Sequence, residues 1–233
     1  MMTIPTQEKL VKHSLADLLR TEIMNGALRS GERIIEAKWA ARFNVAQGSI
    51  REAINILTYE GFLTKQAGRS ARVIHYTEQD VLQLYEVRGA LEGLAARLVA
   101  NARADISALR FAMDGMREAS QAGHREALLD CDLQFHRQLC EASANPFLIE
   151  QSRRILLPFF AFVRIRVAAS GQDTTIWCRD LEAHQRIVDL ISDNEGELAE
   201  QYVRKAMQRF AATAYSNWGN QGSSGNAKLT PSP

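Results

Sequence analysis

The sequence lacks any long, uninterrupted apolar segment. Hydrophobic residues make up 46% of its 233 residues, yet no stretch approaches the roughly 18 uncharged apolar residues that a membrane-spanning helix needs. The first residues, MMTIPTQEKLVKH, contain no apolar run that could serve as a secretion signal. These absences predict a cytoplasmic protein, and the hydrophobic content is sufficient for two modest domains with buried cores.

Cysteine is also scarce. The three cysteines are an odd number and show no CxxC spacing, which indicates neither a disulfide framework nor a zinc knuckle. We therefore expect Cys131, Cys140 and Cys178 to be reduced and mostly buried.

The chain has almost no net charge, because 28 Lys and Arg balance 27 Asp and Glu. The charges are unevenly distributed: residues 1–78 carry 11 basic and 8 acidic residues, whereas the remainder carries 17 and 19. The N-terminal part is therefore the better candidate for contact with phosphate groups.

Three helices are predicted before residue 61. The apolar residues between Glu8 and Met24 recur at helical spacing, and a second, shorter helix ends at Asn44, which tolerates left-handed backbone. A third begins within four residues of Asn44, has a candidate capping box at Ser49–Glu52 and ends at Gly61.

Two short β-prone runs follow these helices. Residues 62–65 and 71–74 flank the polar and basic stretch Gln66–Ser70, which is typical of a hairpin with a solvated tip. Three helices followed by a hairpin predict a winged helix-turn-helix.

The rest of the chain is predicted to be helical. Six amphipathic segments cover roughly residues 79–103, 105–122, 124–143, 146–169, 174–193 and 195–217. The fold class is therefore mainly α: a winged helix-turn-helix DNA-binding domain over 1–76, and an antiparallel all-helical bundle over 77–218. The Gly-, Ser- and Pro-containing tail, 219–233, is expected to be disordered.

The third helix has the form of a recognition helix. The short turn before it exposes Gln47, Gly48, Ser49 and Arg51 for insertion into a major groove. Gln pairs with adenine edges, Arg pairs with guanine edges or phosphate, and Gly48 allows close backbone approach. The alternative for Arg51 is a solvated helix face or an intrahelical ion pair.

A second set of polar residues falls on predicted buried faces of the bundle. Arg88 lies in an apolar stripe that includes Val81, Leu84, Tyr85, Leu91, Ala95 and Leu98. A buried arginine requires an anion, which would be Glu92, Asp132 or the carboxylate of a ligand.

Asp132, His136 and His184 are the other inward polar residues. Asp132 and His136 are four residues apart on one helix, and His184 lies on the inward face of another. Such a set can hold a divalent metal with open positions for a ligand. The alternative is that each is a hydrogen-bonded polar residue of the core.

Residues 36–74, EAKWAARFNVAQGSIREAINILTYEGFLTKQAGRSARVI, resemble the DNA-binding domain of the GntR family, most specifically in R-E-A-I followed by L-x-x-E-G-F-L. The resemblance implies that Arg51 contacts DNA, whereas Gln47 stands where a second arginine is common. It also implies that Gly68 and Arg69 form a wing tip that enters a minor groove, although Ser70 stands where glycine is frequent.

Residues 79–217 resemble the FCD effector domain of the FadR branch of that family, especially in D-x-x-F-H at 132–136 followed by E-A-S-A-N-P. Metal-binding FCD domains use an Asp and three His. Asp132, His136 and His184 match three of these positions, and the fourth falls at Phe210, which cannot bind metal. Three ligands would hold zinc or nickel with water and effector completing the shell; alternatively, the metal has been lost.

These features predict a ligand-responsive transcription regulator, either a repressor or an activator, and not an enzyme. A homodimer would bind a pseudo-palindromic operator, and a small organic acid near Arg88, Asp132, His136, His184 and Phe210 would reorient its DNA-binding domains. One alternative is a metal-dependent helical hydrolase or isomerase. Another is a metal-free regulator that binds an acyl thioester, with Phe210 lining the pocket. No membrane partner is expected.

Overall fold

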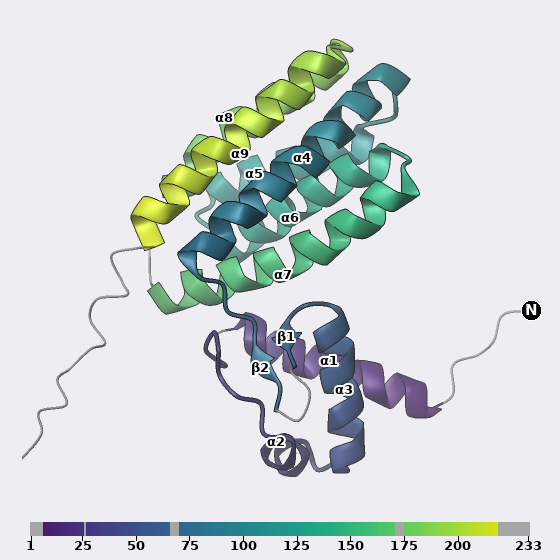
Figure 1. Ribbon diagram of the computed structural model, residues 1–233, viewed down its shortest axis with the longest axis vertical. Coiled ribbons are helices and arrows are strands. Elements are labelled where there is room, and N and C mark those ends of the chain that lie inside the picture. Colours follow the sequence, from purple (N-terminus) through teal and green to yellow (C-terminus); the bar gives the residue numbers. More distant parts are fainter. Residues whose placement is uncertain (1–6, 26, 66–69, 171–174, 219–233) are drawn as a thin grey trace, which may run out of the picture.

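The computed structural model describes residues 7–25, 27–65, 70–170 and 175–218 of the chain (Figure 1). Within these residues the N-terminal elements are α1 (Gln7–Met24), α2 (Glu36–Phe43), α3 (Gln47–Tyr59), β1 (Leu63–Thr64) and β2 (Arg72–Val73). The C-terminal elements are α4 (Glu78–Ala102), α5 (Ser107–Gln121), α6 (Arg125–Ala142), α7 (Pro146–Ser170), α8 (Thr175–Ser192) and α9 (Gly196–Trp218). In this part of the chain, none of the helices is long and apolar enough to cross a membrane.

The N-terminal elements form the predicted winged helix-turn-helix. The tight turn between α2 and α3 depends on Asn44, which adopts the left-handed conformation with φ 52°. Helix α3 buries Ile50, Ala53, Ile54 and Leu57 against its neighbours, and β1 pairs antiparallel with β2. The fold class is therefore confirmed: a winged helix-turn-helix is followed by a bundle of helices.

The predicted capping box of α3 is wrong. The helix begins at Gln47, after Ala46 in extended conformation, and the N-cap residue Ala46 makes no side-chain capping hydrogen bond. The backbone N–H of Ser49 already donates to the carbonyl of Ala46, so Ser49 lies inside the first helical turn. By contrast, Asn145 caps the start of α7, because its Oδ1 accepts from the backbone N–H groups of Phe147 and Leu148.

The buried face of α4 is also rotated from the predicted one. It includes Arg88 but is centred on Gly89, Gly93 and the residues beside them, because α4 lies directly along α9. A side chain at position 93 would place its Cβ 3.2 Å from the carbonyl oxygen of Glu200. Glycine therefore permits the close contact, and the predicted core residues Leu84, Leu91 and Leu98 are left half-exposed at the edge of that face.

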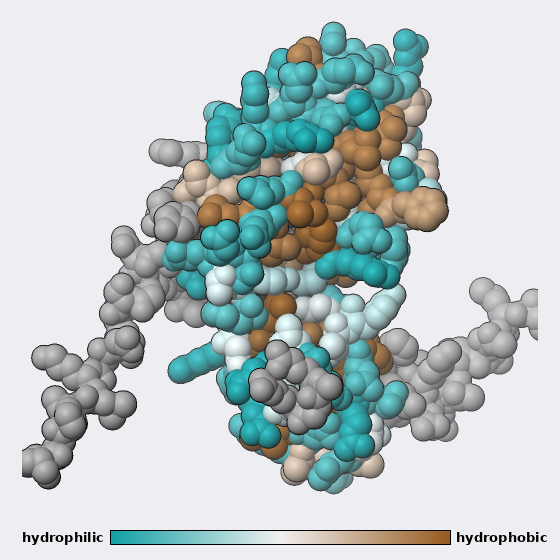
Figure 2. Space-filling model, viewed as in Figure 1, coloured by the Kyte–Doolittle hydropathy of each residue, from teal (hydrophilic) through white to brown (hydrophobic). Residues whose placement is uncertain are grey.

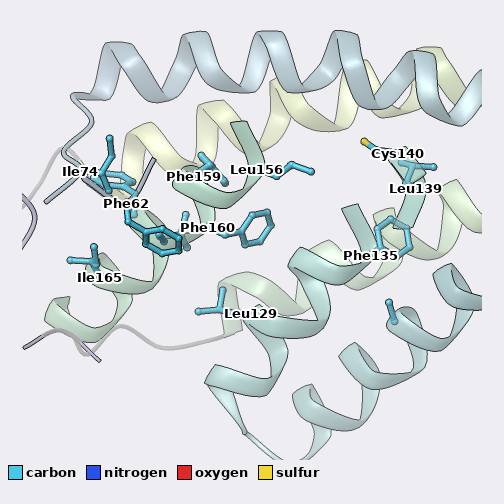
Figure 3. Close-up of a cluster of buried hydrophobic side chains, with 14 of the residues drawn as sticks. Phe62, Ile74, Leu129, Phe135, Leu139, Cys140, Leu156, Phe159, Phe160 and Ile165 are labelled. Atoms are coloured by element: carbon cyan, nitrogen blue, oxygen red, sulfur yellow. The ribbon is translucent and has the colours of Figure 1, made fainter. Parts of the chain in front are cut away.

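The two halves of the molecule meet at α7. Gly61, in the left-handed region with φ 82°, lies against Pro158 in the middle of α7, and a Cβ at position 61 would be 2.2 Å from its Cγ. The Tyr76 ring lies 5.2 Å from the Phe162 ring in edge-to-face contact. Figure 3 shows residues of both halves in one continuous apolar cluster, with Phe62 of the winged half near one end.

Some predicted features fall outside the described residues. The wing-tip residues Gly68 and Arg69, the tail 219–233 and the side chain of Cys178 belong to this group. Of the other two cysteines, both free thiols, Cys140 is buried as predicted, whereas Cys131 is only half-buried.

Candidate DNA-binding surface and buried polar centre

The N-terminal end of α3 is accessible. Gln47, Gly48 and Arg51 are exposed and Ser49 is half-buried, while a Cβ at position 48 would meet no atom of the described residues within 4 Å. Gly48 therefore leaves the space in front of the helix open for another molecule.

Arg51 is neither free in solvent nor paired within its own helix. Its Nη2 and Nε donate to Oε2 of Glu36 on α2 at 2.9 and 3.1 Å, and the hydrogen bond and charge of Glu36 raise the pKa of Arg51. The pair joins the two helices of the helix-turn-helix motif. It also fixes the direction of a guanidinium group that remains open to solvent.

Within the bundle, α6 and α8 bring three potential metal ligands together. Oδ1 of Asp132 lies 3.2 Å from Nε2 of His136 and 3.2 Å from Nε2 of His184, and the two imidazole nitrogens are 3.4 Å apart. All three residues are buried. The sequence-predicted set is thus assembled from helices that are distant in the chain.

These distances fit a common metal ion. Bonds of about 2.0–2.1 Å to zinc place neighbouring ligand atoms about 3 Å apart, which is close to the observed separations. Oδ1 of Asp132 is fully buried, and in the described part of the chain no group is aligned to donate a hydrogen bond to it, although both imidazole nitrogens lie 3.2 Å away. A buried carboxylate oxygen without an aligned donor is costly, and a metal ion between the three atoms would satisfy it.

Glu92 on α4 is the carboxylate beside this set. One oxygen accepts from Nε of Arg88 at 2.8 Å, and the other lies 2.5 Å from Nδ1 of His136. Burial alone would raise the pKa of Glu92, but the charges of Arg88 and His136 lower it to about 2. Glu92 is therefore ionised, and its two oxygens contact Arg88 and His136 at the same time.

The same network governs the histidine and the aspartate. Burial would lower the pKa of His136, but the charge of Glu92 and the neighbouring carboxylates raise it to about 9. Burial would raise the pKa of Asp132, but the imidazoles of His136 and His184 hold it well below its usual range. At neutral pH and without metal, the centre therefore contains a carboxylate facing a protonated imidazole.

Arg88 is held by aromatic rings as well as by Glu92. Its guanidinium carbon lies 4.6 Å from the ring centre of Phe159 and 5.4 Å from those of Phe160 and Tyr85. Among the residues that the structure describes, Nη2 of Arg88 is buried without a hydrogen-bond partner. One of its donors is therefore still available to an anion.

Two domain families match the chain. Residues 11–73 match the gntR family of bacterial regulatory proteins and residues 83–209 match the FCD domain. The chain belongs to the GntR family. Regulators of this kind are transcription factors and not enzymes, so the prediction that the chain is not an enzyme is confirmed.

Other GntR regulators are similar over most of their length. The Nta operon transcriptional regulator of Aminobacter aminovorans is 33% identical over 78% of this chain and 83% of its own. A protein of Paenarthrobacter nicotinovorans named "Probable D-xylose utilization operon transcriptional repressor" is 27% identical over 92% of this chain and 95% of its own.

Solved structures of GntR regulators share the fold. A regulator from Rhodococcus sp. RHA1 superimposes with a TM-score of 0.73 at 21% identity, over 88% of this chain and 97% of its own. E. coli McbR/YncC gives 0.72 at 16% identity, over 94% of this chain and all of its own. These likenesses support the architecture alone.

In this GntR regulator the position of the expected third histidine is occupied by an apolar residue. Phe210 on α9 is half-buried and packs against the core. The contact of Glu92 with His136, in addition to Arg88, was not predicted from the sequence. The available signal was its position four residues after Arg88, which is one helical turn along the same buried face.

Proposed function

We propose that the protein is a homodimeric, ligand-responsive repressor that works in the bacterial cytoplasm and binds a pseudo-palindromic operator. The exposed N-terminal end of α3 carries this proposal. Arg51, aided by Gln47, Gly48 and Ser49, would contact base edges and phosphates in the major groove, and Gly68 and Arg69 would contact the minor groove.

The effector is a small carboxylate bound at the centre of the bundle. Arg88 offers the unpaired donor Nη2, and a guanidinium group suits a carboxylate in size and charge. Asp132, His136 and His184 would hold zinc or nickel, as their donor distances support. When bound, such an ion provides open coordination positions for an oxygen ligand.

The contacts of α7 link this centre to the DNA-binding half. Phe160 lies 5.7 Å from the ring of His136, and two residues earlier Pro158 touches Gly61, just after the recognition helix. Because the centre is buried, a ligand that enters it must displace surrounding side chains. A shift of α7 would change the orientation of α3, and affinity for DNA would change with it by linkage.

The homodimer is supported by the outer face of α4. Leu84, Val87, Leu91, Leu94 and Leu98 follow the alternating spacing of three and four residues that is typical of a helix-pairing seam. Val87 is 46% exposed, and Phe147 at the start of α7 is 82% exposed. Figure 2 shows apolar residues gathered over α4 and α7 on this face, which a second copy would cover.

The deciding experiment measures binding of the full chain to its own upstream DNA and to random duplex across a salt series. We expect sequence-selective, salt-sensitive binding that Arg51→Ala weakens roughly tenfold or more. Arg154→Ala, which removes an exposed arginine of α7 paired with Glu150, is the matched control and should bind like wild type. If wild type binds both duplexes with equal affinity, the upstream DNA does not contain the operator. If Arg51→Ala binds the upstream DNA as tightly as wild type does, α3 is not the recognition helix.

A further inference from the structure

We infer that Glu92 is the positioning residue of the metal centre, and that it sets the imidazole of His136 with Nε2 facing Asp132 and His184. This inference rests on the proposed metal centre but concerns a residue that would not touch the metal. It is drawn from the contact between Oε2 of Glu92 and Nδ1 of His136. These atoms are 2.5 Å apart, although the two residues are 44 positions apart in the chain.

An imidazole binds metal through a ring nitrogen without a proton. The carboxylate of Glu92 can only accept hydrogen bonds, so it requires the proton of His136 on Nδ1. The lone pair is then on Nε2, the nitrogen that lies 3.2 Å from Oδ1 of Asp132. Glu92 thus selects both the tautomer and the orientation of the ring.

The position of Glu92 is itself well defined. The side chain is 1% exposed, and its other oxygen is held by Nε of Arg88 at 2.8 Å. Arg88 in turn is enclosed by the rings of Tyr85, Phe159 and Phe160. One carboxylate therefore holds two residues. These are Arg88, which is expected to bind the effector anion, and His136, which is expected to bind the metal.

Glutamine in place of Glu92 would break this arrangement while conserving its size. Its amide has one acceptor oxygen for the two donors, and its NH₂ group would face either Arg88 or His136. If the NH₂ group faces His136, the ring must present a lone pair on Nδ1 and carry its proton on Nε2, which blocks the metal. Loss of such outer partners lowers metal affinity by roughly 10- to 100-fold.

The test is titration of the metal-free full chain with Co²⁺, with affinity taken from competition with a chelator and ligand geometry from the visible absorption bands. We expect Glu92→Gln to bind Co²⁺ roughly 10- to 100-fold more weakly than wild type, with altered bands. Glu200→Gln, which removes a carboxylate paired with Arg97 and Arg204 between α4 and α9, should leave both readouts unchanged.

A second variant covers the case in which Glu92→Gln fails to fold because Arg88 loses its anion. Glu92→Asp keeps a carboxylate beside Arg88 but is one methylene shorter, so it should no longer reach Nδ1 of His136 and should also weaken Co²⁺ binding. Equal Co²⁺ affinity and spectra with and without Glu92 would overturn the positioning role and leave the metal centre standing. If wild type binds Co²⁺ no better than His136→Ala, the metal centre itself is wrong, and the role of Glu92 falls with it.

Discussion

The Arg51–Glu36 pair of the DNA-binding half and the Arg88–Glu92 pair of the bundle have nearly the same length, 2.9 and 2.8 Å. Their surroundings differ greatly. The side chains of the first pair are 56% and 28% exposed, and those of the second are 3% and 1% exposed. One pair is surrounded by water and the other by aromatic rings.

This contrast separates two uses of the same chemistry. An ion pair in water contributes little to stability, because the solvent screens it and competes for both partners. Arg51 can therefore leave Glu36 for a phosphate or a base at small cost. A buried pair cannot exchange in this way, since removing one partner leaves an uncompensated charge in the core. Arg88 can only gain an anion beside Glu92, through its unpaired donor.

Breaking the buried pair should have the largest effect. Arg88→Ala leaves Glu92 buried without its arginine and should lower the free energy of unfolding by about 3–5 kcal/mol, as measured by denaturant unfolding of the metal-free chain. Arg51→Ala, the same substitution in the exposed pair, should leave the unfolding midpoint unchanged. If the two substitutions lower the free energy of unfolding equally, the difference in burial between the two pairs does not affect stability.

Gly61→Ala tests the contact that connects the two regions. The left-handed backbone at Gly61 should cost about 1–2 kcal/mol in unfolding free energy for any residue with a Cβ, and the clash with Pro158 should add to that. Gly123→Ala is the control, because Gly123 has φ 69° and nothing within 4 Å of an added Cβ. If the two variants lose the same stability, the contact with α7 does not hold the halves together.

The buried centre should also give metal binding a steep pH dependence. The pKa of His136 is raised to about 9, so below this pH a metal ion must displace a proton from the ring. Affinity for Ni²⁺ should therefore rise about tenfold per pH unit between about pH 7 and 8.5 and level off above about pH 9. A flat profile over this range, measured by competition with a chelator, would contradict the raised pKa.

The smallest effect is expected from Glu36→Gln. This change removes the charge that holds Arg51 while leaving the arginine in place, so affinity for the operator should increase a few-fold at low salt. Glu150→Gln, at the exposed Arg154–Glu150 pair of α7, is the matched control and should have no effect. Weaker operator binding by Glu36→Gln would mean that the pair is needed to aim Arg51.

Much of the architecture could be predicted because it depends on local chemistry. Helical periodicity and the turn residues Asn44 and Gly61 place the helices within a few residues of their observed ends. The spacing of Asp132 and His136 puts both on one face of α6 whatever packs against it. The predicted capping box at Ser49 was wrong because the sequence around the start of α3 is compatible with more than one first residue of the helix.

Amino-acid order by itself determined the family, the winged helix-turn-helix followed by a helical bundle, and the presence of inward polar residues on α4, α6 and α8. Only the tertiary structure decided which of them meet. His184 joins His136 across 48 residues, and Glu92 joins His136 across 44. Helix periodicity specifies the face on which a residue lies, but the partner of that face depends on close packing, as where Gly89 and Gly93 allow α9 to approach α4 closely.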